Sequence, residues 1–404
     1  MIAGASRLHR KGALYWRVAF TRLMSPFFSA FLLCLLFTAS GVHGAATADR
    51  PVFPAAHPVL AGAPGILAKR DALMKQGAAA LTAGDTSAAA MAFETAVSMV
   101  HAPDAELGLV RSTMQAGKYR QALSYGAHTA GAHKDEPEGT ALYVLLLHVG
   151  GQEAAAKRIL LEAQARTPGD AVLAWAQRRI EGGYATSSEK PGAAGAFAPS
   201  SLPLLKAATA AMSGSGVVID HGRHALVALA SVSHARKVWV RNGLGHLRKA
   251  VVKSRFEKDG IALLKLDQSV PLPDGFLTAG KDPFPGSIVY AIEYAMVRGA
   301  QPEWPVLRHG FLGRPVGNHP DWELGITMPN GPHGGPVFDV SGSLAGVTIT
   351  TVHGKPTFMP INQIRRLLGD RLAPAMPEIK GTRMAMEQVY ENAMAVTVQV
   401  LTAR

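Results

Sequence analysis

The chain has 404 residues, enough for two or three domains, and 48% of them are apolar, which suffices for well-packed cores. The formal net charge of +12 becomes +7 without the five basic residues of the first 44 positions, and no Lys/Arg block is dense enough to indicate nucleic-acid binding. The single cysteine, Cys34, lies in an N-terminal apolar run, which excludes disulfides and thiolate metal sites from the remainder of the chain.

Residues 1–44 carry basic residues and no acidic ones, then an apolar run over 27–37, then small residues. This order is typical of a secretory signal peptide, because the apolar run is short for a membrane span. A retained N-terminal anchor is the alternative. We therefore expect an exported protein, periplasmic or secreted in a bacterium, with no stable membrane span once the signal is removed.

Residues 66–183 follow a linker rich in Pro and Ala over 45–65, and their Ala/Leu-rich composition predicts helices. Turn signals recur about every 34 residues, at Ala83-Gly84-Asp85, Ala116-Gly117-Lys118 and Gly150-Gly151-Gln152. Each precedes a helix with small and large residues at helical spacing: Ala89/Phe93/Ala96, Ala122/Gly126/Thr129 and Ala156/Leu160/Ala163, of which the second departs from the pattern. The period resembles the tetratricopeptide repeat, which implies an α-solenoid of stacked helical hairpins that holds a protein partner.

Residues 208–370 follow a flexible linker over 184–207 and contain two groups of predicted strands. The first group has five members: 216–220, 225–230, 237–241, 246–255 and 261–266. The second has six: 287–294, 306–312, 323–328, 336–340, 344–352 and 356–359.

The stretch Gly331-Pro332-His333-Gly334-Gly335-Pro336 precedes a predicted hairpin, two β-runs joined by a Gly/Ser turn. It resembles the nucleophile loop of trypsin-like (chymotrypsin-fold) serine proteases of the bacterial high-temperature-requirement type, which reads Gly-Asn-Ser-Gly-Gly-Pro. His333 occupies the serine position, and an imidazole cannot form the acyl-enzyme by the serine route. The resemblance implies oxyanion-hole amides at Gly331 and His333, so Gly331 to Gly335 are candidate peptide-binding residues.

The other two triad positions of the resembled family are also replaced. The general base falls on Ala230, and the aspartate that orients it falls on Gly260. Asp259 is one residue out of register, which turns a strand side chain to the opposite face. The resemblance therefore implies a pseudoprotease, with no catalytic residue at Ala230, Gly260 or His333.

The family fold has two six-stranded barrels, so the first group is one strand short. The C-terminal extension, 371–404, contains a helix-then-strand pattern over 386–402. We expect Val396–Leu401 to complete the first barrel beside Gly216–Asp220, as in a circularly permuted fold, because an open barrel edge would expose a hydrophobic strand. Alternatively, this tail begins another domain or pairs with a partner.

These patterns predict a multidomain α and β protein that acts as an exported, non-catalytic scaffold for protein or peptide partners. The alternative is an active periplasmic serine-type endopeptidase with a rearranged site, in which His333 or His234 works with Ser231 or Ser343. No cofactor is expected. The histidines, including His221, His224, His309 and His319, lack metal-ligand spacing and are interpreted as surface residues.

Overall fold

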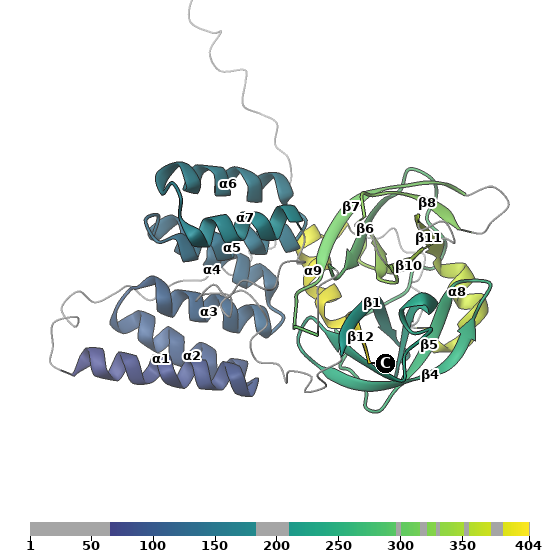
Figure 1. The fold of residues 1–404 in the computed structure, drawn as a ribbon, viewed down its shortest axis with the longest axis horizontal. Helices are drawn as coiled ribbons and strands as arrows, with labels where there is room; N and C mark the ends of the chain where they lie inside the picture. The colour runs from purple at the N-terminus through teal and green to yellow at the C-terminus, as the bar shows by residue number, and fades with distance from the viewer. Residues whose placement is uncertain are drawn as a thin grey trace, which may run out of the picture. The chain divides into compact units, whose positions relative to one another are not determined.

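A computed structural model describes residues 65–182, 210–295, 300–315, 321–328, 332–350, 355–372 and 383–403 of the chain, and Figure 1 labels their helices and strands. They all fall within one unit, Arg50–Arg404. The predicted signal peptide (1–44) and the linker over 184–207 lie outside the described residues. Within the described ranges, no helix combines the length and the apolar character needed to cross a membrane.

The described part of the helical region is a run of helices in which each packs on its chain neighbour (Figure 1). Gly84, Gly117 and Gly151 follow three of the helices with φ of 80°, 77° and 83°, a left-handed conformation that favours glycine and ends a helix. All three lie in the turns predicted from the sequence. The helices are α1 (Ile66–Ala83), α2 (Thr86–Met99), α3 (Pro103–Gln115), α4 (Tyr119–Ala132), α5 (Pro137–Val149), α6 (Glu153–Arg166) and α7 (Ala171–Gly182).

The predicted small and large positions of these helices are buried in their interfaces. The ring of Phe93 in α2 lies against two glycines of the neighbouring helices, Gly77 in α1 and Gly108 in α3, where a larger side chain would not fit. A Cβ added at Gly77 or Gly108 would lie 2.7 Å or 2.4 Å from that ring. The helical packing is thus as expected, whereas the tetratricopeptide resemblance itself stays a prediction.

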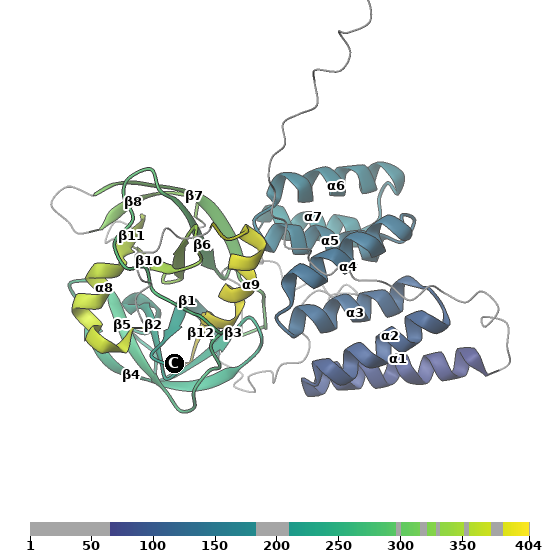
Figure 2. The ribbon, with the colours of Figure 1, turned by 180° about the vertical axis from the view of Figure 1, so that it is seen from behind.

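The β region forms two closed, antiparallel six-stranded barrels, as predicted, with strand orders β1-β12-β3-β4-β5-β2 and β10-β11-β8-β7-β6-β9 (Figures 1 and 2). The first barrel contains β1 (Ala211–Ile219), β2 (His224–Ala228), β3 (Lys237–Asn242), β4 (Leu247–Phe256), β5 (Ile261–Leu266) and β12 (Thr397–Ala403). The second contains β6 (Ile288–Glu293), β7 (Val306–Pro315), β8 (Trp322–Gly325), β9 (Pro336–Asp339), β10 (Leu344–Thr350) and β11 (Pro356–Pro360). The helices α8 (Ile361–Leu368) and α9 (Met386–Val396) follow in the chain, with the 3-10 turn η3 (Gly369–Arg371) between them.

Strand β12 lies between β1 and β3 and pairs with both in antiparallel register. Val398 faces Gly216 on one side and Asn242 on the other. This pairing confirms that the C-terminal strand completes the first barrel. The alternatives of a detached tail or of a strand held by a partner chain do not apply to it.

Strand β1 begins at Ala211, five residues before its predicted start. Residues 211–215 include no β-branched residue and have weak strand propensity, but pairing with β12 extends the strand, with a register shift between Met212 and Gly214. The predicted end of the next strand was also wrong. Strand β2 stops at Ala228, and residues Leu229–Ser231 form the 3-10 turn η2.

Helix α9 packs on α4 of the helical region and on β1 and β3 of the first barrel, and it reaches Pro305 just before β7. The Tyr390 ring meets the Tyr119 ring edge to face with centroids 4.5 Å apart, and its hydroxyl donates to the Pro305 carbonyl oxygen at 2.7 Å. Both tyrosines are fully buried. The segment that leads into β12 is therefore fixed by aromatic packing as well as by strand pairing.

Candidate functional site

His333, at the position that the resemblance assigns to the nucleophile, is buried in the protein. The residue is 2% exposed, and its Nδ1 lies 2.8 Å from Oε2 of Glu293, the last residue of β6. A serine that attacks peptides must face the substrate, whereas this imidazole faces a buried carboxylate. Nδ1 is therefore occupied within the protein and is not presented to a peptide.

Glu293 accepts hydrogen bonds from several groups in and beside the loop. Its Oε1 accepts hydrogen bonds from the backbone N–H groups of Gly334 and Gly335, at 3.2 and 3.0 Å, and from the Thr348 hydroxyl. Burial raises the pKa of the Glu293 carboxyl, but His333, Thr348 and the Gly335 amide outweigh burial and hold that pKa below its ordinary value. The buried carboxylate is thus stabilised as an anion.

The backbone of the loop is engaged in the same way. The His333 N–H, which the resemblance assigns to the oxyanion hole, donates to the Thr350 hydroxyl at 3.0 Å. Pro332 is half-buried, and Gly331 lies outside the described residues. A Cβ at Gly334 would lie 2.5 Å from the Ser215 carbonyl oxygen and 2.8 Å from the Ala228 amide nitrogen, so only glycine fits where the loop meets the first barrel.

Ala230 and Gly260 carry no group that could act as a base or a carboxylate. Ala230 is exposed in η2, and Gly260 has φ of 67° in the turn before β5. The Leu229 N–H donates to the Gly260 carbonyl oxygen at 2.8 Å, so these two segments do meet as the resemblance implies. Asp259, the neighbouring carboxylate, accepts at 2.9 Å from the Gln363 amide of α8.

The two serines of the alternative, rearranged site are both buried. Ser231 is 4% exposed, and its Oγ has no hydrogen-bond partner among the described residues. It faces the backbone of β1, because a Cβ at Gly214 would lie 2.2 Å away. Ser343 is 3% exposed with its Oγ 3.1 Å from that of Ser341, in the turn between β9 and β10. His234 is exposed.

His224 was expected on the surface, and that prediction was wrong. It is 7% exposed, and its Nδ1 lies 2.7 Å from Oδ2 of Asp220. The other oxygen of that carboxylate, Oδ1, accepts from Arg223 at 2.7 Å. Burial raises the pKa of Asp220, but the hydrogen bonds from Arg223 and His224 outweigh it, so this pKa lies below its ordinary value. Because Asp220 and His221 both have φ of 52°, these contacts stabilise a strained turn between β1 and β2. His221 and His309 are exposed, and His319 lies outside the described residues.

A cavity of about 760 Å³ lies elsewhere, between the α5–α6 turn, β7 and the start of α9. Lys157 and Arg308 are among its lining residues, and Nη1 of Arg308 is buried with no hydrogen-bond partner among the described residues. The Arg308 guanidinium can donate to a carbonyl or carboxylate oxygen of a molecule in the cavity. Reasoning from the sequence missed this site, because its residues come from three separate parts of the chain.

Two closed six-stranded barrels with this loop at their junction define the class of the β region, a trypsin-like two-barrel fold. No family model matches the chain, and no curated protein matches it. Among solved structures, the chain is similar to the apo form of the MamO protease domain from Magnetospirillum magneticum, at 21% identity and a TM-score of 0.32, covering 40% of this chain and 95% of that one. It is also similar to the serine endoprotease from Yersinia pestis, at 16% identity and a TM-score of 0.31, covering 39% of this chain and 60% of that one.

Proposed function

We propose that this chain is an exported, non-catalytic scaffold that binds protein or peptide partners through tetratricopeptide-like repeats and an inactive trypsin-like domain. The observation that carries the proposal is the hydrogen bond between His333 and Glu293. It directs the residue at the nucleophile position into the barrel. An acyl transfer enzyme needs a nucleophile within reach of a base and free donors for the oxyanion.

The described part of the loop, 332–336, offers neither a nucleophilic side chain nor a free donor at His333, Gly334 or Gly335. The His333 amide already donates to Thr350, and those of Gly334 and Gly335 already donate to Glu293. Saturated donors cannot strengthen their bonds as charge develops on a substrate oxygen. These hydrogen bonds, together with the residues at the triad positions, support the proposed non-catalytic function.

The test of inactivity is covalent labelling of the purified protein by a fluorophosphonate probe, with trypsin as the positive control. We expect no labelled serine. Stoichiometric labelling of one serine, identified by peptide mapping, would overturn the proposal. Labelling of Ser231 or Ser343 in particular would favour the active, rearranged endopeptidase instead.

For the partner, the proposed contact is the cavity beside Arg308. Its unpaired guanidinium donor and the nearby Lys157 favour a peptide that offers carboxylate or carbonyl oxygens. Synthetic acidic peptides and sequence-matched amidated peptides can be compared by fluorescence anisotropy against the wild type and Arg308→Leu.

Arg314→Leu is the matched control, because Arg314 also lies in β7 and its side chain is 83% exposed. We expect Arg308→Leu to weaken acidic-peptide binding and Arg314→Leu to leave it unchanged. Equal binding by all three proteins would remove this cavity from the proposal.

A further inference from the structure

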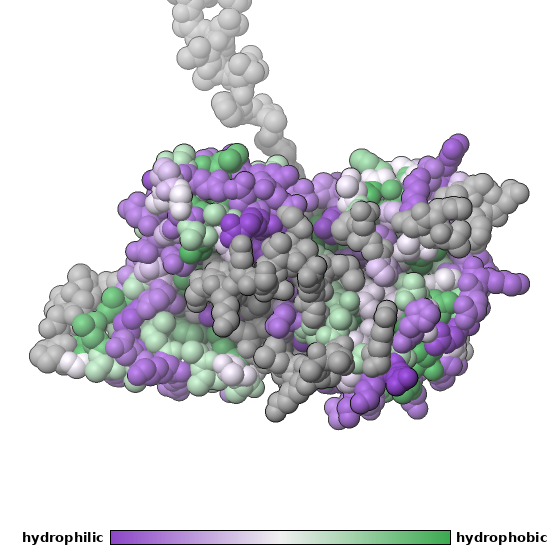
Figure 3. All heavy atoms as spheres, viewed as in Figure 1, coloured by the Kyte–Doolittle hydropathy of each residue, from purple (hydrophilic) through white to green (hydrophobic). Residues whose placement is uncertain are grey.

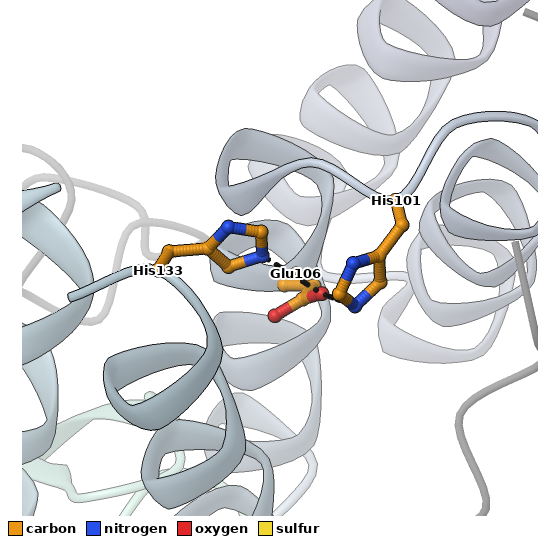
Figure 4. Close-up of side chains that lie close together, drawn as sticks. All are labelled: His101, Glu106 and His133. Carbon is orange, nitrogen blue, oxygen red and sulfur yellow. Dashed lines mark hydrogen bonds and ion pairs between the residues drawn. The ribbon is translucent and has the colours of Figure 1, made fainter. Parts of the chain in front are cut away.

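Four side chains with metal-ligating atoms meet in the helical region, far along the chain from the barrels. His101 lies in the short connection between α2 and α3, and Glu106 lies in the first turn of α3. His128 lies in α4, and His133 is the first residue after the end of that helix. Figure 4 shows His101 and His133 directing their rings at the Glu106 carboxylate from opposite sides.

The ligand atoms converge on one oxygen. The Nε2 atoms of His101, His133 and His128 lie 2.6, 3.3 and 3.9 Å from Oε1 of Glu106, and those of His101 and His128 lie 3.3 Å apart. Ligand atoms around a tetrahedral zinc ion, at bonds of about 2.0–2.2 Å, are separated by about 3.3–3.6 Å. The ligand atoms of His101, Glu106 and His133 all lie within 4.8 Å of one another, and His128 offers a fourth nitrogen 3.3 Å from that of His101.

Burial gives a second, independent indication. Glu106 is fully buried, and its Oε2 has no hydrogen-bond partner among the described residues. A buried carboxylate with an unpaired oxygen is unfavourable unless a cation neutralises it. The side chains of His101, His128 and His133 are 31%, 39% and 16% exposed, so the cluster has a route to solvent through which an ion could enter.

We propose that His101, Glu106, His128 and His133 bind one divalent transition-metal ion, for which zinc is the best fit. Imidazole and carboxylate ligands suit zinc, and a set of four protein ligands is typical of a structural site that leaves no position for substrate. The ion would tie the α2–α3 connection to the end of α4. This site goes beyond the scaffold function, since it concerns what holds the helical region together.

No metal site was expected here, because the histidines show none of the familiar ligand spacings along the sequence. Here the ligands come in two pairs, His101 with Glu106 and His128 with His133, each five residues apart. One pair spans a helix start and the other a helix end. Only the packing of α3 on α4 brings the two pairs together. Among the described residues, His101, Glu106 and His133 are the group of metal-ligating side chains whose ligand atoms lie close together, and all three belong to the helical region.

The test uses the whole chain, purified without a polyhistidine tag, stripped with a chelator and titrated with CoCl2 and then ZnCl2. We expect one equivalent of Co²⁺ to bind with the intense visible absorption of a tetrahedral ion, and Zn²⁺ to displace it. Zinc should also raise the melting temperature, because it binds only the folded state. A weak octahedral spectrum, or no saturable binding by the wild type, would overturn the proposal.

Variants assign the ligands. Glu106→Gln keeps the size and removes the charge, and we expect it and His133→Ala to lower zinc affinity by about 100-fold or more. His309→Ala is the control, since that histidine is exposed in the second barrel and should leave binding unchanged. If Glu106→Gln or His133→Ala keeps the wild-type affinity and cobalt spectrum, the assignment is wrong. If either variant fails to fold, the wild-type cobalt titration still decides.

Discussion

Glu293 is predicted to be the residue on which the stability of the loop over 332–336 depends most. The change to test is Glu293→Ala, compared with Glu293→Gln. In the alanine variant, the Gly334 N–H keeps an acceptor in the Thr348 hydroxyl at 3.1 Å, and that hydroxyl keeps the Gly335 carbonyl oxygen at 3.2 Å. The Gly335 N–H and the His333 ring lose the carboxylate.

The magnitude follows from these two unpaired donors. Each buried donor left without a partner costs about 1–3 kcal/mol. We therefore expect Glu293→Ala, which leaves two such groups, to lower the free energy of unfolding by about 2–6 kcal/mol. Glu293→Gln keeps an oxygen acceptor for the amides and a polar group beside the His333 ring, so its cost should be about 1–2 kcal/mol.

Urea unfolding followed by tryptophan fluorescence measures these differences. Glu323→Ala is the matched control, because this glutamate is in the same barrel with its side chain 41% exposed, and it should change stability by less than about 0.5 kcal/mol. Should Glu293→Ala and Glu293→Gln prove equal, or should both lie within 0.5 kcal/mol of the wild type, the loop would not depend on this carboxylate.

Three further outcomes follow from the structure. Burial lowers the pKa of His148 to about 4, so the unfolded chain takes up a proton before the folded one as the pH falls. The free energy of unfolding of the wild type should therefore fall by about 2 kcal/mol between pH 7 and pH 5. In His148→Leu, urea unfolding at both pH values should show that this contribution is missing. Deletion of residues 397–404 removes β12 and should open the first barrel, which aggregation in size-exclusion chromatography would report, whereas a monomer with native circular dichroism would contradict the pairing. His333→Ser alone should give no fluorophosphonate labelling, because Ala230 supplies no base, and labelling of the new serine would contradict this account.

Much of the fold could be predicted from local patterns. Glycines that must adopt positive φ marked the helix ends, and the six predicted strands of the second barrel all form. The start of β1 could not be predicted, since residues 211–215 have little strand propensity of their own and are held by pairing with β12. Counting strands found β12 itself, because a closed barrel requires a sixth member.

The partner of His333 could not be predicted from the sequence. The resemblance assigned the triad positions to Ala230, Gly260 and His333, but nothing in it pointed to Glu293, forty residues before His333 in the chain. One signal was present in the sequence: a single carboxylate ends the otherwise apolar strand Ile288–Glu293. A charge at the end of a buried strand needs partners, and the loop that follows later in the chain provides them.

Under the proposed non-catalytic function, the same hydrogen bonds give this loop a structural role. A catalytic loop holds donors that stay unsatisfied until a transition state forms, and this costs stability. Here the amides of His333, Gly334 and Gly335 have permanent acceptors in Thr350 and Glu293. In the non-catalytic function proposed above, open donors serve no purpose, and Glu293 beneath the loop can saturate them. The described part of the loop then packs where the two barrels meet, and these hydrogen bonds stabilise its shape.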